Sequence, residues 1–409
     1  MDIRSLLNPV ARDDQPATYR YRPLAGKDEI RVLVLEPGHF GDPLRGSFAV
    51  TSLKDYDNHR KSHSIVRSAR RIHAVTQYEA MSYAAISYAW GSSLKPHSIV
   101  VEGAEIAITA SLHEALQYLR YCDIARALWA DAVCINQGDA VELSSQVNQM
   151  ADVYGAAGQV LVWLGGAEDR DSLARAVAGI FYEVERDRAD LPMNLPMNLP
   201  EFHQMRLDQG KTSLQLSDDL LISGLLTCVQ WCRLPWFSRL WVVQESSPEI
   251  AADLTFREGH VSIDRDAFSA ALCVACNIRE TRSHARAISL DLRASISGSS
   301  SAPARSGSEA FTTLLQYAER VCVDPRDRIY AFIRLLGVEA FDDLRADYTS
   351  SYHALCTNFV SRCIRWRERP HYIHHALVLA LKGTEEECAS MPLPSWITHL
   401  DGFGAASRK

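Results

Sequence analysis

The chain has 409 residues, enough for one large domain or two ordinary ones. Its 43 Lys and Arg residues against 50 Asp and Glu residues give a formal net charge of −7, which argues against a broad nucleic-acid-binding surface. Its apolar runs fall far short of the roughly 18 residues of a membrane-spanning helix, and the N-terminus lacks the apolar stretch of a secretory signal. The ten cysteines are scattered rather than framed as disulfides. We therefore expect a soluble cytoplasmic protein without nucleic-acid or membrane partners.

In chain order, an irregular arm over residues 1–24 precedes strands that alternate with helices. The expected strands are 30–35, 84–88, 127–135 and 159–164, with a hairpin over 98–109 that turns at Glu102-Gly103. One helix begins at Ser111, where Glu114 completes a capping box, and a second covers 141–156. This alternation predicts a parallel sheet with helical crossovers.

Each crossover helix has apolar residues at helical spacing, which predicts the face that packs on the sheet. These residues are Leu112, Ala115, Leu116 and Leu119 in the first helix and Val147, Met150, Ala151 and Tyr154 in the second. After Gly165 the pattern becomes mainly helical, with a Gly- and Ser-rich loop at 297–308 and helices at 310–321, 328–336 and 352–366. We expect a core domain over 25–260 and a helical extension over 261–409 packed on it.

Three short signatures stand out, and each combines aromatic residues with polar ones. They read Ala85-Ile-Ser-Tyr-Ala-Trp-Gly91, Trp129-Ala-Asp-Ala-Val-Cys-Ile-Asn-Gln137 and Arg233-Leu-Pro-Trp-Phe-Ser-Arg-Leu-Trp-Val-Val-Gln-Glu245. Together they resemble the fungal heterokaryon incompatibility (HET) domain, and two later stretches, at 324–331 and 393–396, add to the likeness. One departure is Leu143, because the family commonly has an Arg at that position.

The resemblance implies a fold and an activity. HET domains are distantly similar to TIR domains, so we expect a TIR-like (flavodoxin-like) parallel sheet with helical crossovers and a mainly helical C-terminal half. The resemblance also implies a fungal effector of self/non-self recognition or programmed cell death. Several TIR domains cleave NAD at the nicotinamide–ribose bond with one Glu, which makes hydrolysis of NAD(P) the sharpest hypothesis for this chain.

Glu245 is the principal candidate for the catalytic carboxylate. Trp241 precedes it by four residues, a spacing that places both on one face of a helix. A carboxylate can stabilise the oxocarbenium-like state of N-glycoside cleavage, and an aromatic ring can stack on the base. The alternative is a structural ion pair between Glu245 and Arg233 or Arg239 that holds the element in place.

Asp131 is the second catalytic candidate, since it follows a strand and can face the crevice where open α/β sheets bind ligands. A buried Asp that bonds backbone amides is the alternative. The candidates for substrate binding are Tyr88, Trp90, Gly91, Asn136, Gln137, Glu142, Arg239 and Trp241. Capping and core packing are the alternatives for these residues. If these candidates form one site, we expect one pocket at the carboxyl edge of the sheet, lined by Asp131, Asn136, Glu245 and either Tyr88 or Trp90.

The cysteine and histidine groups of the sequence give weaker indications of a functional site. The Cys273-Val-Ala-Cys276 pair lacks a second pair at zinc spacing, and a cluster at His371, His374 and His375 is interpreted as structural, so no metal site or cofactor is expected. NAD(P) or another small molecule is then a substrate, and a homo-oligomer or protein partner is expected. A non-catalytic, self-associating signalling module and a HET-fold enzyme reused for a small metabolite remain alternative functions.

Overall fold

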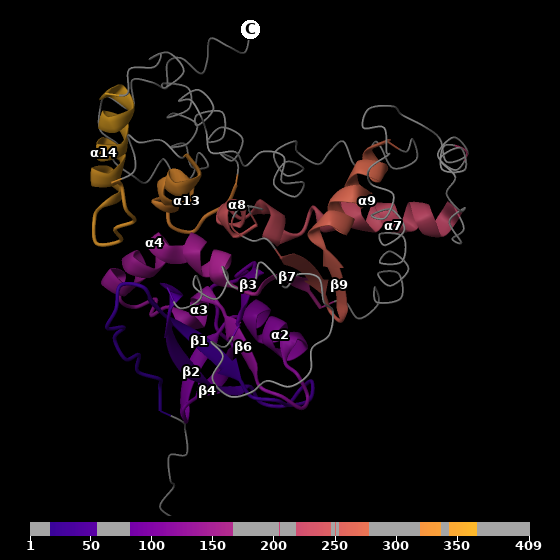
Figure 1. The fold of residues 1–409 in the computed structure, drawn as a ribbon, viewed down its shortest axis with the longest axis horizontal. Coiled ribbons are helices and arrows are strands. Elements are labelled where there is room, and N and C mark those ends of the chain that lie inside the picture. The colour runs from indigo at the N-terminus through magenta and orange to yellow at the C-terminus, as the bar shows by residue number, and fades with distance from the viewer. Residues whose placement is uncertain are drawn as a thin grey trace, which may run out of the picture.

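The computed structural model describes residues 17–54, 82–166, 204, 218–246, 250, 253–277, 320–336 and 343–365. Within these residues one sheet of nine strands runs in the order β5-β4-β2-β1-β6-β3-β7-β8-β9. Figure 1 shows the fold, with the helices and strands labelled where there is room. Several predictions lie outside the described residues: the arm up to residue 16, the loop at 297–308, most of the helix at 310–321, the histidine cluster and the 393–396 stretch.

The strands follow the chain from β1 to β9. Their bounds are Glu29–Leu35 (β1), Arg45–Ser52 (β2), Ala84–Tyr88 (β3), His97–Val101 (β4), Ala104–Ile108 (β5), Arg126–Trp129 (β6), Gln159–Gly165 (β7), Leu254–Glu258 (β8) and Val261–Asp264 (β9). The helices are Ala110–Leu119 (α2), Asp131–Cys134 (α3), Ala140–Ala156 (α4), Asp218–Trp231 (α7), Val242–Glu245 (α8), Arg265–Asn277 (α9), Asp327–Leu336 (α13) and Tyr352–Arg365 (α14), with a 3-10 turn η3 at Pro235–Ser238.

The centre of the sheet is parallel. β3 pairs in parallel with β6 on one side and with β7 on the other, and β7 pairs in parallel with β8. These four strands lie side by side as second, first, third and fourth in chain order. The prediction that the strands near 84–88, 128–134 and 160–164 are mutually parallel is confirmed. Their carboxyl ends therefore meet at one edge of the sheet.

The rest of the sheet is mixed, so the prediction of a parallel sheet holds only for its centre. β1 is antiparallel to both β2 and β6, and β8–β9 is an antiparallel hairpin. The β4–β5 hairpin turns at Glu102 and Gly103, as predicted, and both residues have positive φ, as a type I′ turn requires. β2, β8 and β9 were not predicted. The chain after Gly165 is thus not only helical, because β8 and β9 extend the sheet beyond β7.

Helix α2 buries the predicted face, with Leu112, Ala115, Leu116 and Leu119 at most 1% exposed. The predicted capping box is wrong. The N-cap is Thr109, whose hydroxyl accepts a hydrogen bond from Leu112 N at 3.3 Å. The carboxylate of Glu114 instead accepts a hydrogen bond from the Trp163 indole on β7 at 3.3 Å. The Glu114 side chain therefore forms a tertiary contact with β7 instead of a local capping hydrogen bond.

The predicted strand at 127–135 is also too long, because β6 ends at Trp129. The chain turns there into the single turn α3, where Cys134 N donates to Ala130 O at 2.8 Å. The side chain of Asp131 accepts a hydrogen bond from the amide of Ala132 at 2.7 Å, which stabilises this turn. Asp131 thus opens a helical turn just past the carboxyl end of β6.

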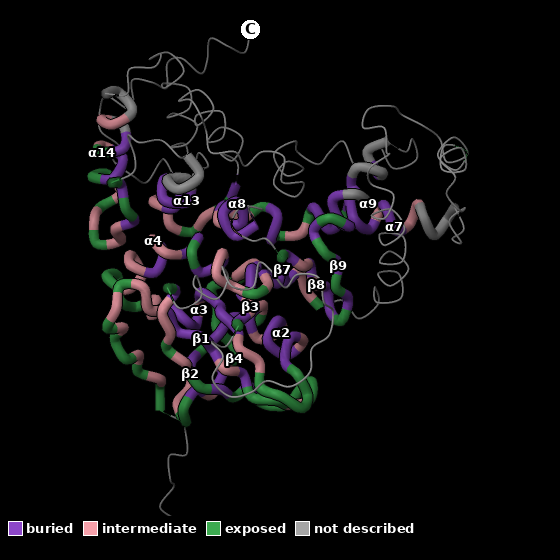
Figure 2. The backbone as a smooth tube through the Cα atoms, viewed as in Figure 1, coloured by how far each residue is buried: buried purple, intermediate pink, exposed green. Residues whose placement is uncertain are grey.

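Helix α4 lies between the sheet and the C-terminal helices (Figure 1). It begins after the N-cap Asp139 and buries Val147, Met150, Ala151 and Tyr154, as predicted. On its other side, Asn148 exchanges hydrogen bonds with the backbone of Ala346, and Ser144 Oγ accepts one from Tyr348 N. Figure 2 shows the neighbouring α8 in the purple of buried residues. Among the described helices, none has the length and apolar character needed to cross a bilayer.

Candidate functional site

A cavity of about 400 Å³ opens beside the carboxyl ends of β3 and β6. Small-molecule pockets typically measure roughly 300–1,000 Å³. One part of the wall comes from the loops after these strands and from α4, and the other from the segments near η3, α13 and Tyr348. The lining residues are Ala89, Trp90, Gly91, Asp131, Ile135, Gln137, Leu143, Val147, Met150, Pro235, Ser238, Arg239, Trp241, Val321, Cys322, Val323, Asp324, Asp327 and Tyr348.

The 321–327 segment reaches the cavity because it pairs with the chain after η3. Leu240 N donates to Val321 O at 2.9 Å, and Val321 N donates to Ser238 O at 2.7 Å. The guanidinium of Arg320 donates to the backbone oxygens of Phe237 and Arg239. These bonds fix two stretches that lie more than 80 residues apart in sequence as one wall of the cavity.

Asp131 and Trp90 form the first polar pair in the cavity. The Trp90 indole N–H lies 3.0 Å from Asp131 Oδ2 and 3.2 Å from Oδ1, so the carboxylate accepts its hydrogen bond. Gln137 Nε2 donates to the backbone oxygen of Asp131 at 2.9 Å. Burial raises the pKa of Asp131 above its usual value, whereas Arg239 and the indole of Trp90 favour the ionised form.

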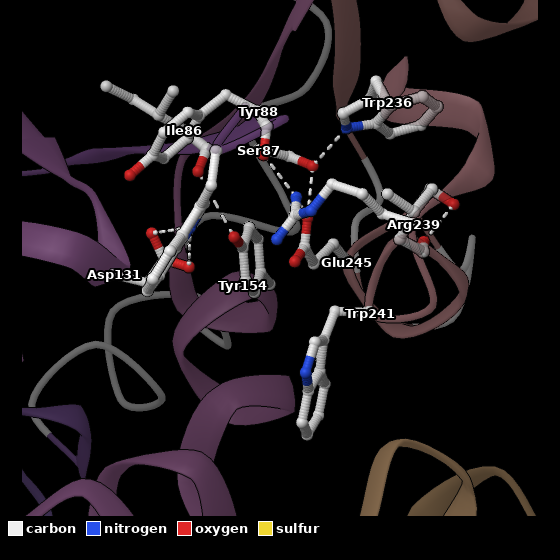
Figure 3. Close-up of polar contacts among 12 residues, drawn as sticks. Ile86, Ser87, Tyr88, Asp131, Tyr154, Trp236, Arg239, Trp241 and Glu245 are labelled. Atoms are coloured by element: carbon white, nitrogen blue, oxygen red, sulfur yellow. Dashed lines mark hydrogen bonds and ion pairs between the residues drawn. The ribbon is translucent and has the colours of Figure 1, made fainter. Parts of the chain in front are cut away.

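Glu245 lies beside this pair in a buried network (Figure 3). Its Oε2 accepts a hydrogen bond from the Ser87 hydroxyl and forms an ion pair with Arg239 Nη1 at 3.4 Å. The Trp236 indole donates to the same hydroxyl at 2.7 Å, and the Arg239 guanidinium also donates to the backbone oxygen of Tyr88. Glu245 is fully buried, and its Oε1 has no hydrogen-bond partner among the described residues.

Charge and burial oppose one another in this network. Burial raises the pKa of Glu245, while Arg239 opposes that rise and Asp131 adds to it. For Arg239 the largest effect, burial, lowers the pKa, but Glu245 and Asp131 outweigh it and the net pKa is raised. Arg239 is therefore a permanent cation held between two carboxyl groups.

A second polar pair stands on the C-terminal part of the cavity wall. Trp241 Nε1 donates to Asp327 Oδ2 at 3.0 Å, and the Tyr348 hydroxyl donates to Asp327 Oδ1 at 2.6 Å. Burial raises the pKa of Asp327 to about 6 even though both hydrogen bonds oppose the rise. The neighbouring Asp324 lies 2.6 Å from Arg326 in an ion pair.

The structure brings six of the ten predicted site residues to the cavity wall, namely Trp90, Gly91, Asp131, Gln137, Arg239 and Trp241. The other four, Tyr88, Asn136, Glu142 and Glu245, are not part of the lining. Tyr88 and Glu245 lie directly behind Arg239 and contact it. Glu142 instead pairs with Arg31, with Nη1–Oε1 and Nη2–Oε2 distances of 2.5 and 2.9 Å, and Asn136 N donates to the same carboxylate.

Two sequence interpretations of Glu245 can be compared with its geometry. Trp241 and Glu245 lie one helical turn apart, as their spacing predicts, because Glu245 N donates to Trp241 O at 3.0 Å. The Trp241 ring nevertheless extends away from the Glu245 carboxylate (Figure 3). The expected ion pair is formed, and Arg239 is its partner. The two side chains thus belong to different parts of the site: Glu245 supports Arg239 and Trp241 bonds Asp327.

Four residues around the cavity were not among the sequence candidates: Ser87, Trp236, Asp327 and Tyr348. Ser87 and Trp236 belong to signatures quoted for the resemblance, so their motifs marked them. The hydrogen bonds that lead from Trp236 to Ser87 and from Ser87 to Glu245 had no local signal. Asp327 ends the conspicuous Asp324-Pro-Arg-Asp327 turn. Tyr348 has no motif in the sequence to distinguish it.

Comparison with known proteins finds a similarity over the segment that builds most of this site. Residues 83–245 match the family model described as Heterokaryon incompatibility protein (HET). The chain is 30% identical over 208 residues to "Heterokaryon incompatibility protein 6, OR allele" of Neurospora crassa. That match covers 46% of this chain and only 30% of the relative's length. No solved structure matches the chain.

Proposed function

We propose that this protein is an incompatibility-type effector that acts by hydrolysing NAD(P) at the nicotinamide–ribose bond, a proposal supported by the match of residues 83–245 to the HET family model. The observation that carries the proposal is the Asp131 carboxylate, which lines a cavity of small-molecule size together with Trp90, Trp241 and Arg239. The parallel centre of the sheet also supports it. Its strand order begins as in flavodoxin-like folds, and the cavity lies at the carboxyl ends of its strands, where such sheets bind nucleotides.

The proposed reaction needs few protein groups. The bond between ribose C1′ and the pyridinium nitrogen breaks, and its electron pair leaves with nicotinamide, which departs as a neutral molecule. Positive charge then develops on the ribose, and a carboxylate close to C1′ stabilises that oxocarbenium-like state. Water adds at C1′ and loses a proton, so the products are nicotinamide, ADP-ribose (or its phosphate) and H⁺.

We assign to Asp131 the stabilisation of the positive charge on the ribose, and to Glu245 the positioning of Arg239. Asp131 belongs to the cavity wall, whereas Glu245 is fully buried behind Arg239. Through its ion pair, Glu245 fixes the guanidinium that in turn favours the ionised form of Asp131. This changes the sequence-based assignment, in which Glu245 was the principal carboxylate, because a group that reaches the ligand only through another side chain cannot contact C1′.

A non-catalytic signalling module is the second candidate. The observation that favours it is the burial of Glu245. The resemblance points to this residue as the catalytic carboxylate, but its side chain is buried in a structural ion pair with Arg239. In that case the cavity would hold a regulatory ligand or a partner side chain, and cell death would follow from self-association. Reuse of the fold for another small metabolite is the remaining enzymatic alternative.

Incubation of the pure protein with NAD, with nicotinamide quantified by chromatography, tests the proposal. We expect nicotinamide and ADP-ribose in equal amounts. NADH is a matched control, because its dihydronicotinamide carries no positive charge and is a poor leaving group, so it should remain intact. A folded protein that releases no nicotinamide from NAD or NADP would contradict the proposed hydrolase and leave the signalling module and the enzyme for another small metabolite.

A further inference from the structure

Two indole–carboxylate pairs line the same cavity. Trp90 bonds Asp131 on the side of the sheet, and Trp241 bonds Asp327 on the side of α13. In each pair the indole N–H is engaged by the carboxylate. A ligand in the cavity therefore meets the π surface of the indoles and the remaining lone pairs of the carboxylates, both of which attract positive charge.

The ionisable groups of the wall have the same preference. Those that carry charge near neutral pH are three carboxyls, of Asp131, Asp324 and Asp327, and one guanidinium, of Arg239. Arg239 is already paired with Glu245, and Asp324 is paired with Arg326. Within the described part of the chain, the hydrogen bonds to the side chains of Asp131 and Asp327 come from neutral donors, and neither carboxyl forms an ion pair. These two carboxylates are the charges left for a ligand.

We propose that this cavity is a binding site for a flat organic cation of the N-alkylpyridinium class. The cation would lie against the two indoles, where a cation–π contact is strengthened by the partial exclusion of water. Asp131 and Asp327 would supply the opposite charge in a partly water-excluded space, where Coulomb attraction exceeds that in bulk water. An anion such as a phosphate would meet two carboxylates and a guanidinium that is already neutralised.

This inference rests on the proposed function and makes it more specific. The nicotinamide ring of oxidised NAD(P) is an N-alkylpyridinium, so the cavity would hold that ring and leave the pyrophosphate outside. Part of the site then comes from residues beyond the matched HET segment, since Asp327 and Tyr348 follow residue 245. The charge that the cavity recognises is also the charge that cleavage removes from the ring, so neutral nicotinamide would leave readily.

Isothermal titration of the full chain with 1-methylnicotinamide and with nicotinamide tests the inference, because the two probes share a ring and differ in charge. We expect 1-methylnicotinamide to bind at least about tenfold more tightly, which corresponds to roughly 1.4 kcal/mol. Equal affinities, tighter binding of nicotinamide, or no binding of either probe would each overturn it. Cation binding without release of nicotinamide from NAD would refute the hydrolase and leave this inference intact.

Variants assign the binding to the cavity. Asp327→Asn keeps the size of the side chain and removes the charge, so affinity for 1-methylnicotinamide should fall about tenfold. Asp343→Asn is the matched control, since Asp343 is exposed and pairs with Arg362 away from the cavity lining; its affinity should equal that of the wild type. Trp241→Phe retains a ring and should lose less affinity than Trp241→Leu. Equal effects of Asp327→Asn and Asp343→Asn would refute the site.

Discussion

Two buried Glu–Arg pairs in this protein share a chemistry and differ in how completely they are satisfied. In the Glu142–Arg31 pair both carboxylate oxygens meet both terminal nitrogens of the guanidinium, and backbone groups complete the set. In the Glu245–Arg239 pair one oxygen meets one nitrogen at 3.4 Å, and the other oxygen has no partner among the described residues.

We interpret Glu142–Arg31 as a structural ion pair and Glu245–Arg239 as an ion pair that positions a residue of the cavity wall. Glu142–Arg31 ties β1 to the start of α4 and is saturated, so it has little capacity for a ligand. Glu245–Arg239 keeps one buried oxygen unbonded and presents its guanidinium to the cavity. A buried polar atom without a partner costs stability, so the Glu245–Arg239 pair is the less completely satisfied of the two.

The saturated pair should be the more costly one to break. Glu142→Gln removes one charge and leaves the buried Arg31 guanidinium without its counter-charge, which should cost about 3–5 kcal/mol in the free energy of unfolding. Chemical denaturation monitored by tryptophan fluorescence measures it. Binding of 1-methylnicotinamide by the folded fraction should be unchanged, since Glu142 is not part of the cavity. A loss below about 1 kcal/mol would contradict the structural role.

Glu245→Gln should cost less, about 1.5–3 kcal/mol, which is the usual worth of a hydrogen bond to a charged group. The amide can still accept a bond from Ser87, and Asp131 continues to favour the charged form of Arg239. The same denaturation experiment checks the order of the two variants. If Glu245→Gln is the more destabilising, the comparison fails. If it leaves stability unchanged and abolishes nicotinamide release, Glu245 is the catalytic carboxylate and our assignment of Asp131 is wrong.

A smaller effect concerns pH and Asp327. Burial raises the pKa of this carboxyl to about 6, with Asp324 adding to the rise and Tyr348, Trp241 and Arg326 opposing it. Between about pH 4 and 6 the native state therefore holds a proton that the unfolded state has lost. Stability consequently falls as pH rises through this window, by at most about 1.4 kcal/mol per pH unit.

Asp327→Asn should remove this contribution, so its loss of stability between pH 4 and 6 should be smaller than that of the wild type. Asp347→Asn is a matched control, because hydrogen bonds from Ser350 and Thr349 lower the pKa of Asp347 to about 2, outside the window. Melting temperatures across the pH range supply the comparison. Identical slopes for the wild type and Asp327→Asn would show that the carboxyl titrates normally and is not buried as described.

The sequence predicted the parts of the fold that depend on local patterns. The crossover helices, the hairpin turn at Glu102-Gly103 and the parallel strands β3, β6 and β7 all have periodic or turn signals within a few residues. The strands β8 and β9 are short. The place of β8 in the sheet depends on pairing with β7, as of Leu254 with Val160, and β9 pairs in turn with β8. The failed capping box has the same origin, because Trp163 on β7 takes the carboxylate of Glu114.

For the site, motifs indicated the segments but not the partners. The motifs contain Trp90, Asp131, Arg239 and Trp241, and in the structure these four residues line one cavity. Spacing alone could not tell that Trp241 turns toward Asp327 while Glu245 turns toward Ser87. Those choices are made by contacts across 86 and 158 residues. Since a single sequence carries no signal for such contacts, Asp327 and Tyr348 were missed.

The central claim is that Asp131 is the carboxylate that stabilises positive charge in the cavity, and one paired measurement tests it. Nicotinamide release from NAD and the melting temperature are measured for the wild type, Asp131→Asn and Asp343→Asn. Loss of one such electrostatic contact costs about 10²–10³ in rate, so Asp131→Asn should lose that much turnover while melting near the wild-type temperature. Asp343→Asn should keep both. Full turnover by a folded Asp131→Asn variant would contradict the account.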